Sequence, residues 1–499
     1  MEALLAGVQV LFTDPLVFVG MVFGIFMGII FGAVPGLTTI LAVTLMIPFT
    51  FAMSPTVGLA ILIGIFAGGI SGGLITATLI NIPGTPASLT TCWDGYPMSK
   101  KGKPAEALSL GVFSSLVGGV VSAIAIFLIA PQLARIALLM GSWELFAICL
   151  MGLCIVSSLS GNDVVKGLMG ASIGLLLGAV GIDSIIGVSR LTFGFWQLTG
   201  GMSMAAIMAG FFAVREICDQ INDLGKPRLK MDVKRISLMP PWKEMKDCAG
   251  AFIWGNLAGI LIGILPGIGQ TPACVLAYNQ AKRTSKYPER FGTGTPEGVV
   301  VSETANTATS GGALIPLITL GIPGDGVTAA LIGGFMIHGL QPGPFLFTQN
   351  PEIVGTIMVA WFLASFILYF MLLGLMRVFI KMVNVKLSFL FPAIIIFCLL
   401  GIFAINHRIF DIWIMIIFGI VGFFMKQLKV DMIALLLGFI LGPMIESNFR
   451  RALVASDGDL SAIFQRPWAV IFLCIALLFL FWPSIKKLYT SIVKNPAGA

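Results

Sequence analysis

The sequence predicts an all-α polytopic membrane protein built from two inverted repeats with discontinuous or re-entrant helices. Three observations predict this fold class: the composition, a set of Gly/Pro elements that occurs twice, and the placement of basic residues around those elements. Of the 499 residues, 57% are hydrophobic and 11% are charged, whereas a soluble domain carries about 25% charged residues. The composition therefore excludes a soluble enzyme, a disordered protein and a nucleic-acid-binding protein.

Apolar stretches occur along the whole chain, and several are shorter than the roughly 20 residues that a full membrane helix needs. The short stretches predict half-helices or re-entrant segments, and we expect roughly 11–15 membrane segments in all. In chain order the stretches are 16–33, 37–53, 56–80, 107–130, 137–160, 167–182, 195–214, 249–265, 268–281, 298–320, 352–376, 388–405, 412–425, 431–446 and 467–483.

A charged interval divides these stretches into two groups. Residues 215–247 contain eight Lys or Arg and six acidic residues, and basic segments between membrane helices stay on the cytoplasmic side. The sequence therefore predicts a first membrane repeat half over 1–214 and a cytoplasmic charged linker over 215–247. A second, inverted half with extra C-terminal helices is predicted over 248–499.

Three Gly/Pro elements occur in the same order in both halves, which predicts an internal repeat. The matched elements are Gly32-Ala-Val-Pro-Gly36 with Gly263-Ile-Leu-Pro-Gly267, Ser71-Gly-Gly73 with Ser310-Gly-Gly312, and Asn81-Ile-Pro-Gly84 with Gly321-Ile-Pro-Gly324.

The charges around these elements predict that the two copies run in opposite directions. The segment 49–55 of the first copy has no charge, whereas its counterpart near 282–290 is basic; after the Ile-Pro-Gly elements the contrast reverses. Because basic loops stay cytoplasmic, matched loops are expected on opposite faces. The first 99 residues contain no Lys or Arg, so the N-terminus is expected outside and the C-terminus inside. One segment, 447–466, disagrees with this scheme because it is predicted outside and contains three Arg.

Matched breaks in hydrophobic segments of an inverted repeat are the best sequence indication of a transporter's binding site. A Pro-Gly break frees backbone N–H groups that suit a carboxylate and carbonyls that suit Na⁺. The candidate binding residues therefore lie at and beside the breaks. They are Pro35, Gly36, Thr38, Thr39, Asn81, Pro83, Gly84, Thr85, Ser88, Pro266, Gly267, Gly269, Gln270, Thr271, Glu303, Asn306, Thr307, Pro323, Gly324 and Asp325.

Structural roles compete with binding for these residues. Ser and Thr often bond their own helix backbone or bridge packed helices, and Gly-Gly pairs often mark close helix packing. Glu303 is a candidate for cation coupling or for a pair with a nearby base. Asp325, in a Pro-Gly-Asp-Gly context, is either functional or a helix cap.

The sequence contains no enzymatic motif that has its required partners. Gly69-Ile-Ser-Gly72 matches the nucleophile motif of intramembrane serine proteases, but a serine nucleophile needs a positioned base. The two histidines lie more than 250 residues downstream, and the eight cysteines are scattered. We therefore expect no catalytic residues, no cofactor and no metal other than a coupling ion.

At these motifs the chain resembles the large membrane subunit of the tripartite tricarboxylate transporters, the TctA family. The resemblance rests on Gly32-Ala-Val-Pro-Gly-Leu37, Asn81-Ile-Pro-Gly-Thr-Pro86 to Trp93-Asp-Gly-Tyr-Pro97, Gly263-Ile-Leu-Pro-Gly-Ile-Gly269, Tyr278-Asn-Gln-Ala-Lys-Arg283 to Pro288-Glu-Arg290, Pro296-Glu-Gly298 and His338-Gly-Leu-Gln-Pro-Gly-Pro344. It implies a secondary transporter of the bacterial inner membrane that works with a small membrane subunit and a periplasmic solute-binding protein.

The resemblance also implies uptake of tricarboxylates such as citrate, driven by an ion gradient. We therefore expect the large permease subunit of a symporter coupled to Na⁺, with H⁺ as the alternative ion. A channel or a structural membrane scaffold is the alternative function; the paired breaks favour a carrier because a scaffold has no need of them.

Overall fold

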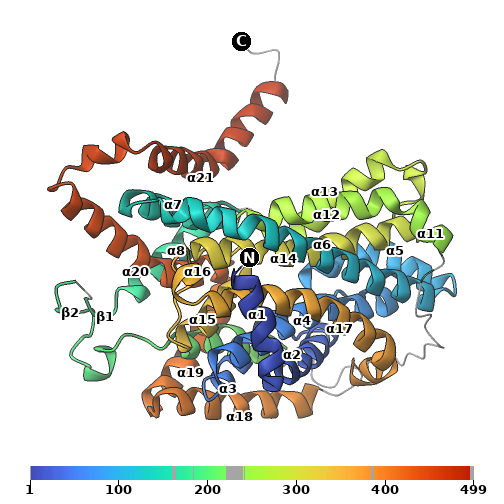
Figure 1. The fold of residues 1–499 in the computed structure, drawn as a ribbon, viewed down its shortest axis with the longest axis horizontal. Helices are drawn as coiled ribbons and strands as arrows, with labels where there is room; N and C mark the ends of the chain where they lie inside the picture. The colour runs from blue at the N-terminus through green and yellow to red at the C-terminus, as the bar shows by residue number, and fades with distance from the viewer. Residues whose placement is uncertain are drawn as a thin grey trace. The chain divides into compact units, whose positions relative to one another are not determined.

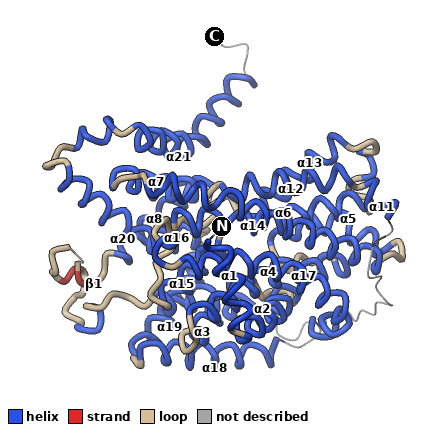
Figure 2. Tube along the Cα trace, in the orientation of Figure 1, coloured by secondary structure: helices blue, strands red, loops and turns tan. Residues whose placement is uncertain are grey.

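The computed structural model describes residues 2–159, 164–183, 185–220, 240, 242–383 and 387–494. Figure 2 shows these residues to be almost wholly helical. Within the described ranges, the one sheet is a short hairpin in which Gly181 pairs with Arg190 and Ile182 with Ser189. The protein is therefore all-α, as the composition predicts.

Most of the described elements are helices. In chain order they are α1 (Glu2–Thr13), α2 (Pro15–Ala33), α3 (Thr39–Thr50), α4 (Pro55–Ile80), η1 (Pro86–Ser88), α5 (Leu89–Lys100), α6 (Pro104–Leu138), α7 (Ser142–Leu159), α8 (Val164–Gly178), β1 (Gly181–Ile182), β2 (Ser189–Arg190), η2 (Trp196–Leu198), α9 (Met204–Ala209), η3 (Gly210–Val214), α10 (Arg215–Gln220), α11 (Trp242–Asp247), α12 (Ala249–Ile264), α13 (Gln270–Thr284), η5 (Pro288–Arg290), α14 (Pro296–Leu320), α15 (Gly326–Ile337), α16 (Leu346–Gln349), α17 (Pro351–Val383), α18 (Leu387–Asn406), α19 (Ile409–Gln427), α20 (Met432–Ala455), η6 (Leu460–Gln465) and α21 (Pro467–Lys494).

Fourteen described helices are apolar, and they differ in length. Six are long and apolar enough to cross a membrane, and eight are shorter apolar helices of 10–17 residues. The short helices include α3, α12 and α15, which adjoin the Gly/Pro breaks. Long spans mixed with half-length helices are the pattern expected of a polytopic protein with discontinuous helices.

The chain forms two compact units, and each unit takes segments from both halves of the sequence. Unit 1 comprises Met1–Arg135 and Phe212–Ile412, and unit 2 comprises Ile136–Phe211 and Trp413–Ala499. The compact units therefore differ from the sequence halves 1–214 and 248–499. Most of the predicted linker 215–247, namely 221–239 and 241, lies outside the described residues. Every break lies in unit 1.

α2 packs beside α4 (Figure 1), and glycines of α2 lie along this contact at a regular spacing of four residues. A Cβ atom at each glycine would collide with a backbone carbonyl oxygen of α4, so only glycine permits this approach of the two backbones. The pairs are Gly24 with Ile61, Gly28 with Ile65, and Gly32 with Gly69.

The same packing recurs between α12 and α14, which lie side by side in Figure 1. There the pairs of glycine and carbonyl are Gly255 with Val301, Gly259 with Ala305, and Gly263 with Thr309. In the sequence, α12 thus follows α2 by 231 residues (Gly24 to Gly255), and α14 follows α4 by 240 residues (Ile61 to Val301). Of the predicted Gly-Gly pairs, Gly68 and Gly72 pack on carbonyls of α2 and Gly312 packs on one of α12, so close packing is confirmed for these three glycines. The two helix pairs share one packing register.

This register corrects one sequence match. Aligning Ser71 with Ser310 gives an offset of 239 residues between α4 and α14, one less than the offset of 240 found from the packing. Gly72 packs on Ile29, and Gly312 packs on Ile260, the residue equivalent to Ile29. Gly72 and Gly312 are therefore the equivalent positions, and the two serines are one residue out of register. One residue is about 100° of a helix, so the serines point in different directions.

Three predicted segments differ from the helices observed in unit 2. The stretch 195–214 is an α-helix only from Met204, because Gly201 has a positive φ and Ser203 caps the helix that follows. The stretch 167–182 ends its helix at Gly178 and continues into β1. The stretch 431–446 continues as α20 to Ala455, so Arg450 lies on a helix and not in a loop.

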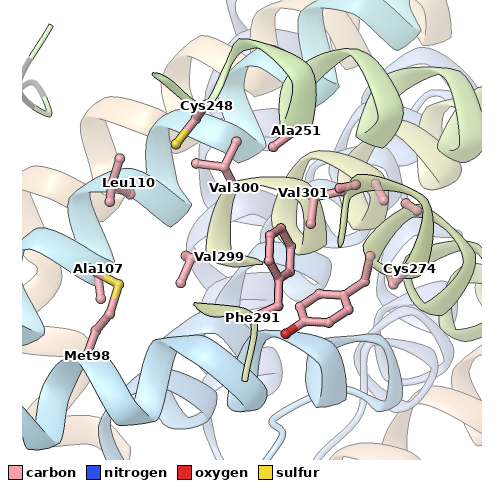
Figure 3. Packing of buried hydrophobic residues seen from close by; sticks show 14 of the residues in the cluster. Met98, Ala107, Leu110, Cys248, Ala251, Cys274, Phe291, Val299, Val300 and Val301 are labelled. Carbon is pink, nitrogen blue, oxygen red and sulfur yellow. The ribbon is translucent and has the colours of Figure 1, made fainter. Parts of the chain in front are cut away.

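An apolar cluster in unit 1 surrounds the start of α14. Figure 3 shows Val299, Val300 and Val301 of α14 among side chains from α5, α6, α12 and α13. Residues from both sequence halves enter this cluster, for example Leu110 and Cys274, and both are fully buried. The cluster holds the polar middle of α14 in place, where the candidate site lies.

Candidate substrate and ion site

The two Pro-Gly breaks (34–38 and 265–269) have equivalent backbones. α2 ends before Val34 and α12 ends before Leu265, and both C-cap residues are extended. Gly36 has φ 90° and Gly267 has φ 77°, a left-handed region that strongly favours glycine. The glycine of each element is thus required by its turn.

The two Pro-Gly breaks differ in how the next helix begins. Thr38 caps α3, and its hydroxyl accepts a hydrogen bond from Leu41 N at 3.1 Å. Gly269 stands at the same position before α13 and has no side chain to cap it. Thr38 therefore has the structural role that competed with binding.

The two Ile-Pro-Gly breaks (81–85 and 321–325) share a different design. The C-cap residues of α4 and α14 are Asn81 and Gly321, and both have the left-handed conformation. Four residues after each cap, a side chain forms a hydrogen bond with the residue three positions later. Thr85 Oγ1 and Ser88 Oγ are 2.8 Å apart, and Thr328 N donates to Asp325 Oδ1 at 2.6 Å. Asp325 forms a full capping box with Thr328, so it is a helix cap.

Each Ile-Pro-Gly glycine packs against the Pro-Gly break of its own copy. A Cβ on Gly84 would collide with the carbonyl oxygen of Gly32, and one on Gly324 would lie 2.9 Å from that of Gly263. The two breaks of each copy are therefore in contact. We call residues 34–38 with 81–85 the first broken pair, and residues 265–269 with 321–325 the second.

The second broken pair closes on itself. Gly267 N donates to Gly324 O at 3.0 Å, which joins its two breaks. The Gln270 amide donates to Asp325 Oδ2 and to Ser310 Oγ, and Pro323, Gly324 and Asp325 are buried. Most polar groups at this pair thus bond one another.

The first broken pair is more open. Thr39, which occupies the position of Gln270, is buried against Gly69, and its hydroxyl has no hydrogen-bond partner among the described residues. Asn81 is exposed and Pro83 is half-buried. Pro35, Gly36 and Thr38 are partly accessible, as Gly267, Gly269 and Gln270 are in the second pair, so the two pairs differ in exposure at Asn81 and Pro83. A ligand that supplies a hydrogen-bond partner fits here.

The middle of α14 carries a polar face that contacts helices of the first copy. Asn306 Nδ2 donates to the carbonyl of Ile70 on α4 at 3.4 Å, while Asn306 Oδ1 has no partner in the described part of the chain. Glu303 accepts hydrogen bonds from Thr91 and Ser115. All these side chains are buried.

Two predicted residues lie apart from this face. Thr307 lies beside Gly119 of α6, and its hydroxyl has no partner within the described residues. Thr271 is partly exposed in the first turn of α13. The structure therefore places Asn306 and Glu303 within one turn of α14, and it places Thr39 on Gly69 of α4, the residue before Ile70, whose carbonyl Asn306 bonds. Thr307 and Thr271 lie outside these contacts.

Asp94 is a buried carboxylate that the sequence reasoning did not single out. Its oxygens accept hydrogen bonds from Tyr278 Oη at 2.6 Å, Gly294 N at 2.7 Å and Thr295 N at 2.9 Å. It thereby binds the free N–H groups before α14, where a negative charge is favoured. The feature of the sequence that could have identified Asp94 is an acidic residue between two aromatic residues, Trp93 and Tyr96, in a chain with few charges.

His338 lies at the start of α4, and it does not act as a base for Ser71. Its Nε2 lies 3.3 Å from Thr50 Oγ1 and packs on Gly58, thirteen residues before Ser71. Ser71 Oγ is buried and has no partner among the described residues. The protease motif therefore lacks the histidine that it needs.

Unit 2 contains a separate ionic network on the loop after α8. Arg190 forms a bidentate pair with Glu446, with its Nη1 2.6 Å from Oε1, and Arg450 binds Asp183 at 2.8 Å. The backbone N–H groups of Ile185 and Ile186, with Arg450 and Arg190, lower the pKa of Asp183. The network gives the unexpected Arg450 of segment 447–466 a structural role.

The comparisons with known proteins agree with the resemblance seen in the motifs. A family model described as the tripartite tricarboxylate transporter TctA family matches residues 18–437. An uncharacterized 52.8 kDa protein in the TAR-I ttuC' 3'region of Agrobacterium vitis is 36% identical over 457 residues, which cover 91% of this chain and 90% of that protein. No solved structure matches the chain.

A second protein of Agrobacterium vitis is similar over part of the chain. It is an uncharacterized protein in the TAR-II ttuC' 3'region and is 37% identical over 234 residues, which cover 46% of this chain and 96% of that protein. Its length thus corresponds to about half of this chain.

Proposed function

The chain belongs to the tripartite tricarboxylate transporter TctA family, and from this premise we propose that it is the large permease subunit of an ion-driven carboxylate uptake system. In this proposal a periplasmic solute-binding protein delivers a tricarboxylate or a related small carboxylate, and a small membrane subunit completes the complex. The complex resides in the bacterial inner membrane.

One observation carries the proposal: two broken helix pairs share a packing register, and buried polar atoms without partners lie beside the first. A buried hydroxyl or amide that lacks a hydrogen bond costs about 1–3 kcal/mol. Thr39 Oγ1 is such a group among the described residues. A substrate with hydroxyl and carboxylate groups, such as citrate, offers the hydrogen-bond partner that this hydroxyl requires.

The proposed transport mechanism uses the repeat. If the two copies are inverted, the breaks of both meet near the middle of the membrane, and movement of one part of the protein against another alternates access. Na⁺ is the proposed coupling ion, with H⁺ as the alternative. The N-terminus is then periplasmic and the C-terminus cytoplasmic.

Uptake by the reconstituted complex tests the function. Proteoliposomes that contain all three components are expected to accumulate radiolabelled citrate or a related acid when a Na⁺ gradient is imposed. Saturable, coupled uptake supports the carrier. Passive flux that neither saturates nor responds to the gradient supports the channel, and no flux of any carboxylate contradicts both.

Variants at the breaks test the site. We expect the double variants Thr38→Ala with Thr39→Ala, and Asn306→Ala with Thr307→Ala, to abolish uptake and remain folded. Thr319→Ala is the matched control, because its buried hydroxyl donates to Ile315 O of its own helix. Uptake at the wild-type level in both double variants contradicts the site.

Labelling of single cysteines tests the inverted orientation. Ala52→Cys and Lys286→Cys lie in matched segments of the two copies, before α4 and before α14. A membrane-impermeant maleimide is expected to label position 52 from the periplasm and position 286 from the cytoplasm. Labelling of both from the same side contradicts an inverted repeat.

A further inference from the structure

Glu303 lies in the middle of the buried helix α14, where an acidic side chain is expensive. Every residue of α14 from Gly298 to Thr319 is buried, and Glu303 is 0% exposed. Charged residues at membrane depth are rare and mark ion or substrate pathways. The need for this carboxylate is not explained by the packing of α14.

The described neighbours of Glu303 supply oxygens and no positive charge. None of the ion pairs of the described residues includes Glu303. The hydroxyls of Thr91 on α5 and Ser115 on α6 donate to its two oxygens. The titratable groups that face it are the thiols of Cys92 on α5 and Cys274 on α13.

A buried carboxylate with only neutral partners is costly, and desolvation amounts to several kcal/mol per ion. Asp94, in contrast, receives three backbone N–H groups and a tyrosine hydroxyl. Glu303 has no such set among the described residues. The free energy of the folded state therefore favours a bound cation beside Glu303.

A second observation points to the same place. Asn306 lies one helical turn after Glu303 and forms a hydrogen bond with that carboxylate through its side-chain amide. Its Oδ1 is fully buried and has no partner in the described ranges. Carboxylate, hydroxyl and amide oxygens are the ligands of hard cations. Glu303, Thr91, Ser115 and Asn306 together provide such a set from three helices.

We propose that Glu303 is the anionic ligand of the coupling-cation site, with Thr91, Ser115 and Asn306 as its neutral ligands. The site binds a monovalent cation, Na⁺ or H⁺, whose charge neutralises the carboxylate. This proposal rests on the proposed ion-driven function and adds the location of the coupling ion. It places that ion at side chains on and beside α14, and not at the freed carbonyls of the breaks.

The location explains how the cation and the substrate are coupled. Asn306 bonds the carbonyl of Ile70, and Thr39 packs on the adjacent Gly69. A cation that draws Asn306 Oδ1 toward Glu303 changes the contact between α14 and α4 beside the first broken pair. Binding of either ligand then alters the affinity for the other, typically by about 5–150-fold.

The first test measures cation binding by the purified full chain without substrate. NaCl is expected to raise the unfolding temperature of the wild type above its value in choline chloride at equal ionic strength, because a ligand of the native state stabilises it. A series from pH 5 to 8 in choline chloride forms the proton arm. Glu303→Gln is expected to lose the response to whichever cation acts on the wild type.

The second test measures coupling in proteoliposomes with all three components. Glu303→Gln is expected to retain exchange of labelled for unlabelled carboxylate across the membrane, because exchange needs no net movement of the cation. Its gradient-driven accumulation is expected to fall by at least about tenfold, the middle of the range of coupling factors. Glu144→Gln is the matched control, because Glu144 is also a buried carboxylate, on α7, and it accepts a hydrogen bond from Gly141 N.

Thr91 supplies a second pair of variants for the case that Glu303→Gln does not fold. Thr91→Val removes the hydroxyl and is expected to raise the cation concentration for half-maximal uptake by about tenfold, the effect of losing one charge-assisted bond. Thr91→Ser keeps the hydroxyl and is expected to restore the wild-type value. Equal values for Thr91→Val, Thr91→Ser and the wild type overturn the proposal.

The remaining outcomes separate this proposal from the proposed function. If Glu303→Gln keeps both coupled accumulation and the cation response, the cation site is wrong and the carrier function stands. If Glu303→Gln and Thr91→Val both lose exchange while folded, these groups bind substrate and the proposal is overturned. If the wild type transports no carboxylate, the function fails, and the unfolding measurements still decide the cation site.

Discussion

The two broken pairs of unit 1 share a backbone design and differ in their polar side chains. In both, a glycine of the shorter helix packs on a carbonyl of the longer one, and an Ile-Pro-Gly glycine packs on the Pro-Gly break. In the second pair Gln270 bonds Asp325 and Ser310. In the first, the equivalent Thr39 is too short for such contacts, and its hydroxyl has no described partner.

The difference shows that one scaffold serves two purposes. The second pair satisfies its own polar groups, so it resembles a fixed support. Within the described part of the chain the first pair leaves a hydroxyl without a partner, and a buried polar group of that kind is kept where a ligand or water completes it. We infer that the first pair, with α14 beside it, is the part that meets the substrate.

The largest expected effect tests the shared backbone design. Gly32→Ala and Gly263→Ala each place a methyl group against a backbone carbonyl, and each is expected to lower the free energy of unfolding by about 3 kcal/mol, the upper end for overpacking. Thermal unfolding of purified variants measures this. Gly250→Ala, with open space around it, is the control; a loss at only one of the two sites breaks the comparison.

The next effect tests the closure of the second pair. Asp325→Ala removes a capping box and the acceptor of Gln270, and is expected to cost about 2 kcal/mol of stability. Thr85→Ala removes one bond between hydroxyls and is expected to cost about 1 kcal/mol. Denaturant unfolding of the two variants compares them, and equal losses would show that the pairs are closed to the same degree.

A smaller effect on stability is expected at the open position of the first pair. Thr39→Val keeps the shape and removes a buried hydroxyl that bonds nothing in the described chain, so the free energy of unfolding is expected to rise by about 1 kcal/mol, the low end of the cost of an unsatisfied buried group. Carboxylate uptake is expected to fall by about tenfold, the effect of losing one hydrogen bond to the ligand. Unchanged uptake in the folded variant would place the ligand elsewhere.

The smallest effect lies outside both pairs and provides a reference. The lowered pKa of Asp183 means that its ionised form stabilises the folded state above the pKa of the unfolded chain, and that this contribution disappears as the pH falls through the lower folded pKa. The difference in unfolding temperature between wild type and Asp183→Asn is therefore expected to be full at pH 7 and to shrink as the pH falls below the ordinary value of 3.8 toward the lowered pKa of the folded protein. A difference that does not depend on pH contradicts the ionic role, and uptake is expected to be unaffected.

The sequence predicted the breaks well because each depends on local chemistry. Gly36 and Gly267 take a left-handed backbone that strongly favours glycine, and Pro prevents a helix from continuing normally. The Gly-Gly pairs predicted close helix packing for the same local reason, and Gly68, Gly72 and Gly312 do pack on backbone carbonyls. Asp325 was predicted as either a cap or a functional group, and the structure confirms the cap.

The sequence could not predict the partners of polar residues in distant segments. Asp94 binds a loop 198–201 residues later, and Glu303 binds a threonine 212 residues earlier. No periodicity records which helices meet. The mismatch of Ser71 with Ser310 has the same origin, since only the carbonyl that a glycine meets reveals a shift of one residue.

By itself, the sequence determined that this protein is helical, that it is a membrane protein, and that its helices break twice in the same way. These properties follow from composition and from the backbone preferences of Gly and Pro, which act within a few residues. The tertiary structure decided which polar groups are satisfied and which are not: Gln270 reaches Asp325, whereas Thr39 and Asn306 Oδ1 lack described partners. Hydrogen bonding across helices depends on distance in space, and only the folded chain brings those atoms together.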